Sequence, residues 1–261
     1  MTSHFVIASP EGARRSSSRL SRVVLRLLRF ARNVEVVLDQ RFPRRLVWAV
    51  GLSLLLCFGA LIAADVAVTL TEKVIASADK KYGPEARTRL VSWTKLIAAN
   101  GKKSETEKLK LVNDFFNQIP FVSDMEHWGL QDYWATPVEL LASNGGDCED
   151  YAIGKYFTLL ALGFPMDRLR INYVMAINQD PANQAHMVLT YYPKPDAVPF
   201  ILDNLIKEIK LASARPDLIP VYSFNGEGLW LAKERSSGKA SGSSSKISLW
   251  TQMNDRMGKE L

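Results

Sequence analysis

The sequence predicts an α+β fold, because segments with helical periodicity come first along the chain and segments with strand periodicity follow. Up to residue 162, apolar side chains recur at intervals of three and four. After Pro165, β-branched and aromatic residues alternate with polar ones, which is typical of strands. With 261 residues, 47% of them hydrophobic, the chain can build a buried core, which excludes the disordered and fibrous classes.

Start and stop signals delimit the helices. Three segments carry such signals: 84–101, 104–120 and 136–143. The second opens with the capping box Ser104-x-x-Glu107, and the third has Pro137 at its first helical position. A fourth helix is expected over 151–162, and its nearly uniform apolar surface predicts that it is buried on most sides.

The strand patterns begin after Gly163 and Pro165. We expect strands over 170–177, 185–192 and 200–203, with edge strands at 221–224 and 229–231. Residues 236–245 contain six serines and two glycines, which is typical of a flexible linker, and a short amphipathic segment follows at 247–257. These patterns predict a folded domain over 65–235, followed by a linker and C-terminal segment over 236–261.

The net charge of +6 and the pI of 9.3 at first suggest a nucleic-acid-binding protein. Residues 1–45, however, hold ten arginines and three acids, a net charge of +7. The other 216 residues carry 23 basic and 24 acidic side chains, a net charge of −1. Because the basic charge is confined to an N-terminal arm, the sequence predicts no nucleic-acid partner.

The segment 46–64 follows this arm and contains no charged residue. As a helix it would span about 28 Å, close to the thickness of a hydrocarbon core. The arginines before it and Asp65 after it predict a cytoplasmic N-terminus and export of the remaining chain. The small residues at 62–64 resemble a signal-peptidase site, whereas the length of the apolar run favours a membrane anchor. Both alternatives remain open, as does an amphipathic helix or a disordered arm over 19–32.

The cysteines indicate a reactive site. Cys57 lies in the apolar segment, so Cys148 is the single thiol of the exported part. It follows Gly145-Gly146-Asp147 at the expected N-terminus of the buried helix, where backbone N–H groups and the helix dipole favour a thiolate. A lone cysteine at this position is either reactive or buried and inert.

His186 and Asp203 are the candidate partners of Cys148. The chain has three histidines; His4 lies on the cytoplasmic side, and His127 lies in an irregular stretch. His186 lies on a predicted strand, and a strand histidine opposite a helix-borne cysteine is the arrangement of papain-like sites. Asp203, at the end of the next strand, is suited to orient the imidazole ring. We therefore predict a catalytic triad of Cys148, His186 and Asp203.

The run GGDCEDYAIGKYFTLLALGFPMDRLRI, with HMVLTYY and FILDN downstream, resembles the bacterial transglutaminase-like cysteine proteinases over about residues 73–231. The resemblance implies a papain-like fold, in which N-terminal helices and a buried cysteine-bearing helix pack on an antiparallel sheet. It implies Cys148 as nucleophile, His186 as general base and Asp203 as orienting acid.

The resemblance has further functional implications. It implies a periplasmic endopeptidase that cuts near the N-terminus of a large cell-surface adhesin and so releases cells from a biofilm. It also implies an inner-membrane receptor for cyclic di-GMP that holds the protease inactive, and a dependence on calcium. If the apolar segment 46–64 is retained, the inner membrane is a further partner.

The acids around Cys148 give a separate argument for calcium. Asp147, Glu149 and Asp150 would complement the helix dipole as a helix cap and first-turn acids. However, a carboxylate about 6 Å from the thiol costs roughly 3 kcal/mol, about two pKa units, of thiolate stability. A bound cation would remove this cost, and calcium prefers oxygen ligands. The resemblance implies Asp147 and Glu149 as ligands, and we add Asp150 as the third acid of the group.

Three other functions share parts of this pattern. Peptidoglycan hydrolases of the NlpC/P60 kind also place a cysteine on a helix and a histidine on a strand, but small residues usually follow their Asp-Cys pair. Here Glu149 and Asp150 follow it. Transglutaminases and other acyl transferases share the triad. A membrane-tethered binding module without catalytic activity is the non-enzymatic alternative.

Overall fold

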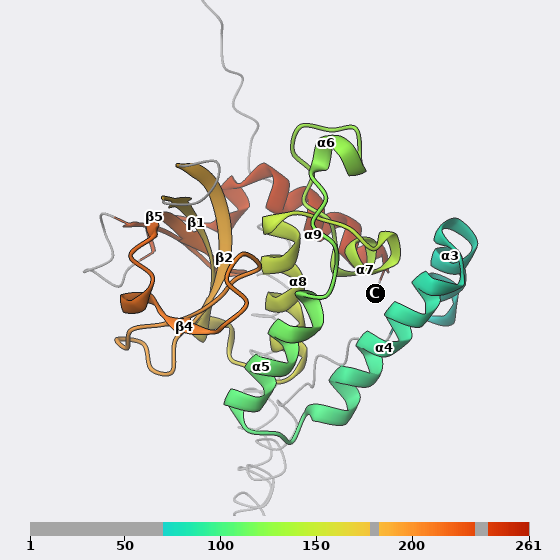
Figure 1. The fold of residues 1–261 in the computed structure, drawn as a ribbon, viewed down its shortest axis with the longest axis horizontal. Coiled ribbons are helices and arrows are strands. Elements are labelled where there is room, and N and C mark those ends of the chain that lie inside the picture. The colour runs from blue at the N-terminus through green and yellow to red at the C-terminus, as the bar shows by residue number, and fades with distance from the viewer. Residues whose placement is uncertain (1–69, 178–182, 233–239, 261) are drawn as a thin grey trace, which may run out of the picture. The chain divides into compact units, whose positions relative to one another are not determined.

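A computed structural model describes residues 70–177, 183–232 and 240–260 (Figure 1). The arginine-rich arm 1–45 and the apolar segment 46–64 lie outside the described residues. In the described ranges, no helix is both long enough and apolar enough to cross a membrane. The described residues belong to one compact unit.

The described helices before the sheet confirm the helical first half of the α+β prediction. Their bounds are α3 (Glu72–Tyr82), α4 (Pro84–Asn100), α5 (Glu105–Phe116), α6 (Asp124–His127), α7 (Pro137–Ser143) and α8 (Cys148–Ala161). The capping box of Ser104 and Glu107 is present at the start of α5. Helices α3 and α6 were not predicted. Thr71 caps α3 by accepting a hydrogen bond from the backbone N–H of Val74 at 3.4 Å.

Helix α8 is buried on most sides, as its apolar surface predicts. It begins at Cys148, three residues before the predicted start, because the Asp150 carboxylate accepts a hydrogen bond from the backbone N–H of Asp147 at 3.3 Å. Gly154 allows α5 to approach closely, since a Cβ atom there would lie 2.5 Å from a ring carbon of Phe116.

The described strands form a single antiparallel sheet in the order β4-β3-β2-β1-β5-β6. Their bounds are β1 (Leu169–Ala176), β2 (Gln184–Tyr191), β3 (Phe200–Leu202), β4 (Lys210–Leu211), β5 (Leu218–Phe224) and β6 (Leu229–Leu231). Strand β5 starts three residues before the predicted edge strand, and the register shifts at Tyr173/Val174 where Pro220 enters the pairing. The sheet confirms the antiparallel half of the predicted fold.

Helix α8 packs beside the central strand β2 (Figure 1). Its side chains share one core with α4, α5 and the inner face of the sheet. The fully buried Trp93 of α4 donates a hydrogen bond from its ring nitrogen to the Thr158 hydroxyl of α8 at 2.8 Å. The cysteine-bearing helix is thus fixed on both sides, and its N-terminus meets the sheet in a defined position.

The C-terminal helix α9 (Ser248–Glu260) also belongs to this core. Trp250 stacks on Phe157 of α8 at a centroid distance of 5.6 Å and meets the ring of Phe224 edge-on at 5.2 Å. The sequence places this segment behind the predicted linker 236–245, of which residues 236–239 lie outside the described ranges. In the structure, the helix after that linker packs against the nucleophile helix.

Candidate active site

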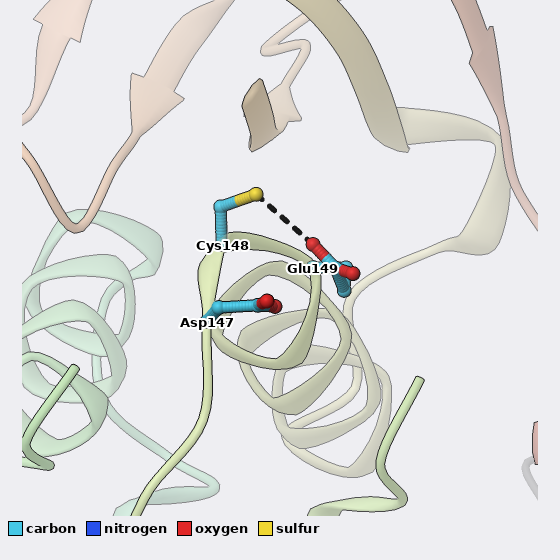
Figure 2. A group of neighbouring side chains, drawn as sticks. All are labelled: Asp147, Cys148 and Glu149. Atoms are coloured by element: carbon cyan, nitrogen blue, oxygen red, sulfur yellow. Dashed lines mark hydrogen bonds between the residues drawn. The ribbon is translucent and has the colours of Figure 1, made fainter. Parts of the chain in front are cut away.

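Cys148 is the first residue of α8, and its side chain is partly exposed. Its sulfur donates a hydrogen bond to Glu149 Oε2 at 3.0 Å, as Figure 2 shows. The backbone of Met187, on β2, lies close enough to this sulfur to act against the rise in the pKa of the thiol. Because Met187 follows His186 directly, the thiol meets β2 next to the predicted base.

His186 and Asp203 are joined in the structure. His186 Nε2 lies 2.8 Å from Asp203 Oδ1, and both side chains are buried. His186 lies in β2, and Asp203 directly follows β3, the strand paired with β2. The contact to Asp203 engages Nε2, so Nδ1 is the ring nitrogen that can serve the thiol.

Several donors hold Asp203 in place. The backbone N–H of Leu205 donates to Oδ1 at 3.0 Å, and Arg215 Nη2 donates to Oδ2 at 2.8 Å. Burial alone would raise the pKa of Asp203, but the hydrogen bonds and charges of His186, Leu205 and Arg215 lower it to about 2. The orienting acid therefore stays ionised at neutral pH.

The thiol has the opposite electrostatic setting. Burial raises the pKa of Cys148 well above its usual value, and the charges of Glu149 and Asp147 raise it further. These are the carboxylates that the sequence predicts to oppose thiolate formation. On its own, this end of α8 favours the neutral thiol.

The acids near Cys148 form a larger cluster than the sequence predicts. Asp147 and Glu149 each group with Asp124, and Glu149 also groups with Asp132; within each group the oxygen atoms lie within 4.8 Å of one another. Burial and mutual repulsion raise the pKa of Asp147 and of Glu149. Among the described residues, Asp124 Oδ1 and Asp147 Oδ1 are buried without a hydrogen-bond partner. Unpartnered oxygens among crowded carboxylates are the donor set that a hard cation such as calcium requires.

Asp150 differs from the other predicted ligands. Its Oδ1 accepts a hydrogen bond from the backbone N–H of Ala135 at 2.7 Å, and its Oδ2 accepts the one from Asp147. It lies in one group with Asp124 and Asp147 but is fully buried. Gly146 makes room for it, since a Cβ atom there would lie 2.5 Å from Asp150 Oδ2. In this structure the Asp150 carboxylate braces the loop before Cys148.

Asp124 and Asp132 are site residues that sequence reasoning missed. They reach the acids that flank Cys148 because the chain after α5 runs beside the glycine loop: Val122 N–H donates to the Gly146 carbonyl at 3.0 Å. Gly145 permits this approach, since a Cβ atom there would lie 2.9 Å from a His127 ring carbon. The only available signal was a pair of acids in an irregular segment, which is too common to indicate a site.

Comparison with known proteins is consistent with this geometry. Residues 90–231 match the model of the bacterial transglutaminase-like cysteine proteinase family. The chain belongs to this family. It is therefore a cysteine proteinase by family, as the sequence predicts, and none of the curated proteins compared with it matches.

Solved structures of LapG from Legionella pneumophila are similar to the chain. One is 45% identical with a TM-score of 0.62, and covers 74% of this chain and 99% of its own. An EGTA-treated form is 46% identical with a TM-score of 0.64, and covers 74% of this chain and 100% of its own. A calcium-bound form is 47% identical with a TM-score of 0.60, and covers 71% of this chain and 98% of its own.

Proposed function

We propose that this cysteine proteinase is a calcium-dependent endopeptidase of the periplasm that cleaves the N-terminal region of a large cell-surface adhesin. The observation that carries the catalytic part is the position of Cys148 at the N-terminus of α8, against the strand that bears the buried His186–Asp203 pair. The adhesin, its role in biofilm release and the periplasm are proposed from family membership and from the charge pattern around residues 46–64.

The chain's own residues supply the steps of peptide hydrolysis. His186 Nδ1 takes the thiol proton while Asp203 holds Nε2, and the sulfur of Cys148 attacks the carbonyl carbon of the substrate. N–H groups in the first turn of α8, which have no partner within the helix, stabilise the oxyanion. His186 then gives the proton to the departing amine, and water releases the acyl group and restores the thiol.

A calcium ion fits the acid cluster. The calcium-bound form of L. pneumophila LapG and the unpartnered oxygens of Asp124 and Asp147 support this assignment. We propose Asp124, Asp132, Asp147 and Glu149 as ligands, with Asp150 holding the loop that presents them. When bound, calcium supplies the positive charge that offsets these carboxylates beside Cys148.

We also propose an inner-membrane receptor for cyclic di-GMP as the partner that restrains the protease. Family membership supports this proposal. If the apolar segment 46–64 is retained, it holds the protease at the same membrane as the receptor. The charge of −1 outside the arginine-rich arm supports the absence of a nucleic-acid partner.

Incubation of the full chain with the N-terminal region of a candidate adhesin tests the proposal. We expect cleavage with calcium, none with EGTA, and none by Cys148→Ala, because that variant lacks the nucleophile. Cys57→Ala is the matched control and should cleave normally, since Cys57 precedes the catalytic domain. Cleavage by folded Cys148→Ala would refute the mechanism. Hydrolysis of peptidoglycan, or incorporation of an amine instead of proteolysis, would favour the alternative enzymes.

A further inference from the structure

The orienting acid Asp203 forms a buried ion pair that the proposed mechanism does not use. Arg215 donates to Asp203 Oδ2 at 2.8 Å, and the two side chains are 1% and 0% exposed. Arg215 follows the short 3-10 helix Ala212–Ala214 and lies on neither of the strands that carry the triad. Burying two charges is costly even when they are paired, so an ion pair at this depth calls for an explanation.

Asp217 fixes the direction of the Arg215 side chain. The Nε and Nη2 atoms of Arg215 both donate to the Asp217 carboxylate, at 2.9 and 2.7 Å. This fork uses the planar geometry of the guanidinium group and leaves little freedom for rotation. Arg215 Nη2 is thereby held against Asp203, and Oδ1 of Asp203 faces His186.

The charges of Asp203, Arg215 and Asp217 do not cancel. One cation between two carboxylates leaves one net negative charge beside His186. Without Asp217, the positive charge of Arg215 would cancel the negative charge of Asp203. Asp217 adds a second carboxylate, so the group keeps one net negative charge. Among the described residues, Lys155 of α8 also faces Asp203, and its Nζ donates to the Asp203 carbonyl at 3.1 Å. Burial lowers the pKa of Lys155 to about 7, so it adds at most part of a positive charge at neutral pH.

We propose that Arg215, braced by Asp217, is a positioning residue for the catalytic acid. Arg215 orients Asp203 so that His186 keeps its proton on Nε2 and presents Nδ1 to the thiol of Cys148. Asp217 fixes the direction of Arg215 and supplies a negative charge beside the Arg215–Asp203 pair. The proposal rests on the proposed function, because it assigns roles within the same triad.

Asp217→Asn in the full chain tests the role of the charge. It removes one negative charge at nearly constant shape, from a side chain that is 17% exposed. We expect kcat for adhesin cleavage to fall about tenfold with KM unchanged, because less negative charge faces the His186–Asp203 pair. Asp196→Asn is the matched control, since it removes the same charge from an exposed residue in the loop between β2 and β3. Its kcat and pH profile should equal those of the wild type.

Arg215→Lys tests the role of the fork. It keeps the positive charge but offers a point donor in place of two directed ones. We expect a lower kcat and a mixed tautomer of His186. Arg215→Met would leave two carboxylates near each other without a cation, which is expected to unfold the domain, so the test does not depend on it.

The ring nitrogens of His186 give a readout that needs no substrate. The chain has three histidines, so comparison with His186→Gln assigns the ¹⁵N signals of the ring. Changed His186 ring signals in Asp217→Asn and a mixed tautomer in Arg215→Lys would support the proposal. Unchanged signals and an unchanged kcat, with only a lower melting temperature, would overturn it. If the wild type cleaves no adhesin, the proposed function fails, and the ring signals still decide this inference.

Discussion

The site has a strand side and a helix side, and the charges of the two sides are satisfied in opposite ways. The strand side consists of His186, Asp203 and Arg215. The helix side consists of Asp124, Asp132, Asp147 and Glu149. On the strand side, both oxygens of Asp203 accept hydrogen bonds, and its pKa is lowered to about 2. On the helix side, burial and repulsion raise carboxylate pKa values, and two buried oxygens have no partner among the described residues.

This difference separates the parts of the site that the chain completes alone from the part that a cation completes. The base and its orienting acid are held by protein donors and need no further group. The nucleophile lies on the helix side, where the surrounding acids favour the neutral thiol. Control of activity through calcium is therefore expected to act on Cys148 and to leave the His186–Asp203 pair in place.

Substitutions on the strand side should give the largest effects on activity. We expect His186→Ala to lower kcat by about 10⁶-fold, because the base and the nucleophile act as a unit. Asp203→Asn should lower it by about 10⁴-fold, since the imidazole ring remains but loses its preferred tautomer. Initial cleavage rates at saturating calcium measure both. Equal rates for Asp203→Asn and the wild type would show that Asp203 is not the orienting acid.

Substitution on the helix side should act through calcium affinity. We expect Asp124→Asn to weaken calcium binding by about 10- to 100-fold, because it removes one charged ligand of the proposed set. Titration calorimetry measures the affinity, and the rise in melting temperature with added calcium measures the linked stability.

The control for this prediction lies on the same helix. Glu126 of α6 is exposed, so Glu126→Gln should leave calcium binding as in the wild type. Equal calcium affinities for Asp124→Asn and Glu126→Gln would remove Asp124 from the ligand set. We expect the environment of His186 to be the same in both variants, because both substitutions lie outside the strand side of the site.

The smallest effect concerns acid stability. Because the pKa of Asp203 is lower in the folded state than in the unfolded chain, its ionisation stabilises the fold above about pH 4. That contribution, about 2 kcal/mol, is lost as the pH falls from 4 towards 2. Urea denaturation of the wild type and Asp203→Asn across this range measures it. A wild-type unfolding free energy with no steeper decrease than that of the variant would contradict the prediction.

The sequence predicts the parts of the site that depend on local signals. Three local signals identify the triad. Cys148 follows a glycine-rich loop at a helix N-terminus, His186 lies on a strand, and Asp203 lies at the end of the next strand. The predicted fold class is confirmed for the same reason, since helix caps and strand alternation are local. The boundaries move by up to four residues, and at two of them a side chain, Asp150 or Pro220, changes the backbone pairing.

Contacts between distant segments could not be predicted from periodicity. Asp124 reaches Asp147 through the pairing of residues 121–122 with the glycine loop, and Arg215 reaches Asp203 across the end of β3. Helix α9 has an amphipathic pattern, but its pattern does not specify which surface it covers. In each case the decisive partner lies 10 or more residues away, where loop geometry fixes the contact.

The stacking of Trp250 on Phe157 has a consequence for the order in which the protein matures. Synthesis proceeds from the N-terminus. The triad residues therefore leave the ribosome well before residue 250; they are Cys148, His186 and Asp203. Until that tryptophan arrives, the rings of Phe157 and Phe224 lack the neighbour that covers them. The nucleophile helix therefore reaches its final packing only after almost the whole chain has been made, which delays the assembly of a working protease during translation.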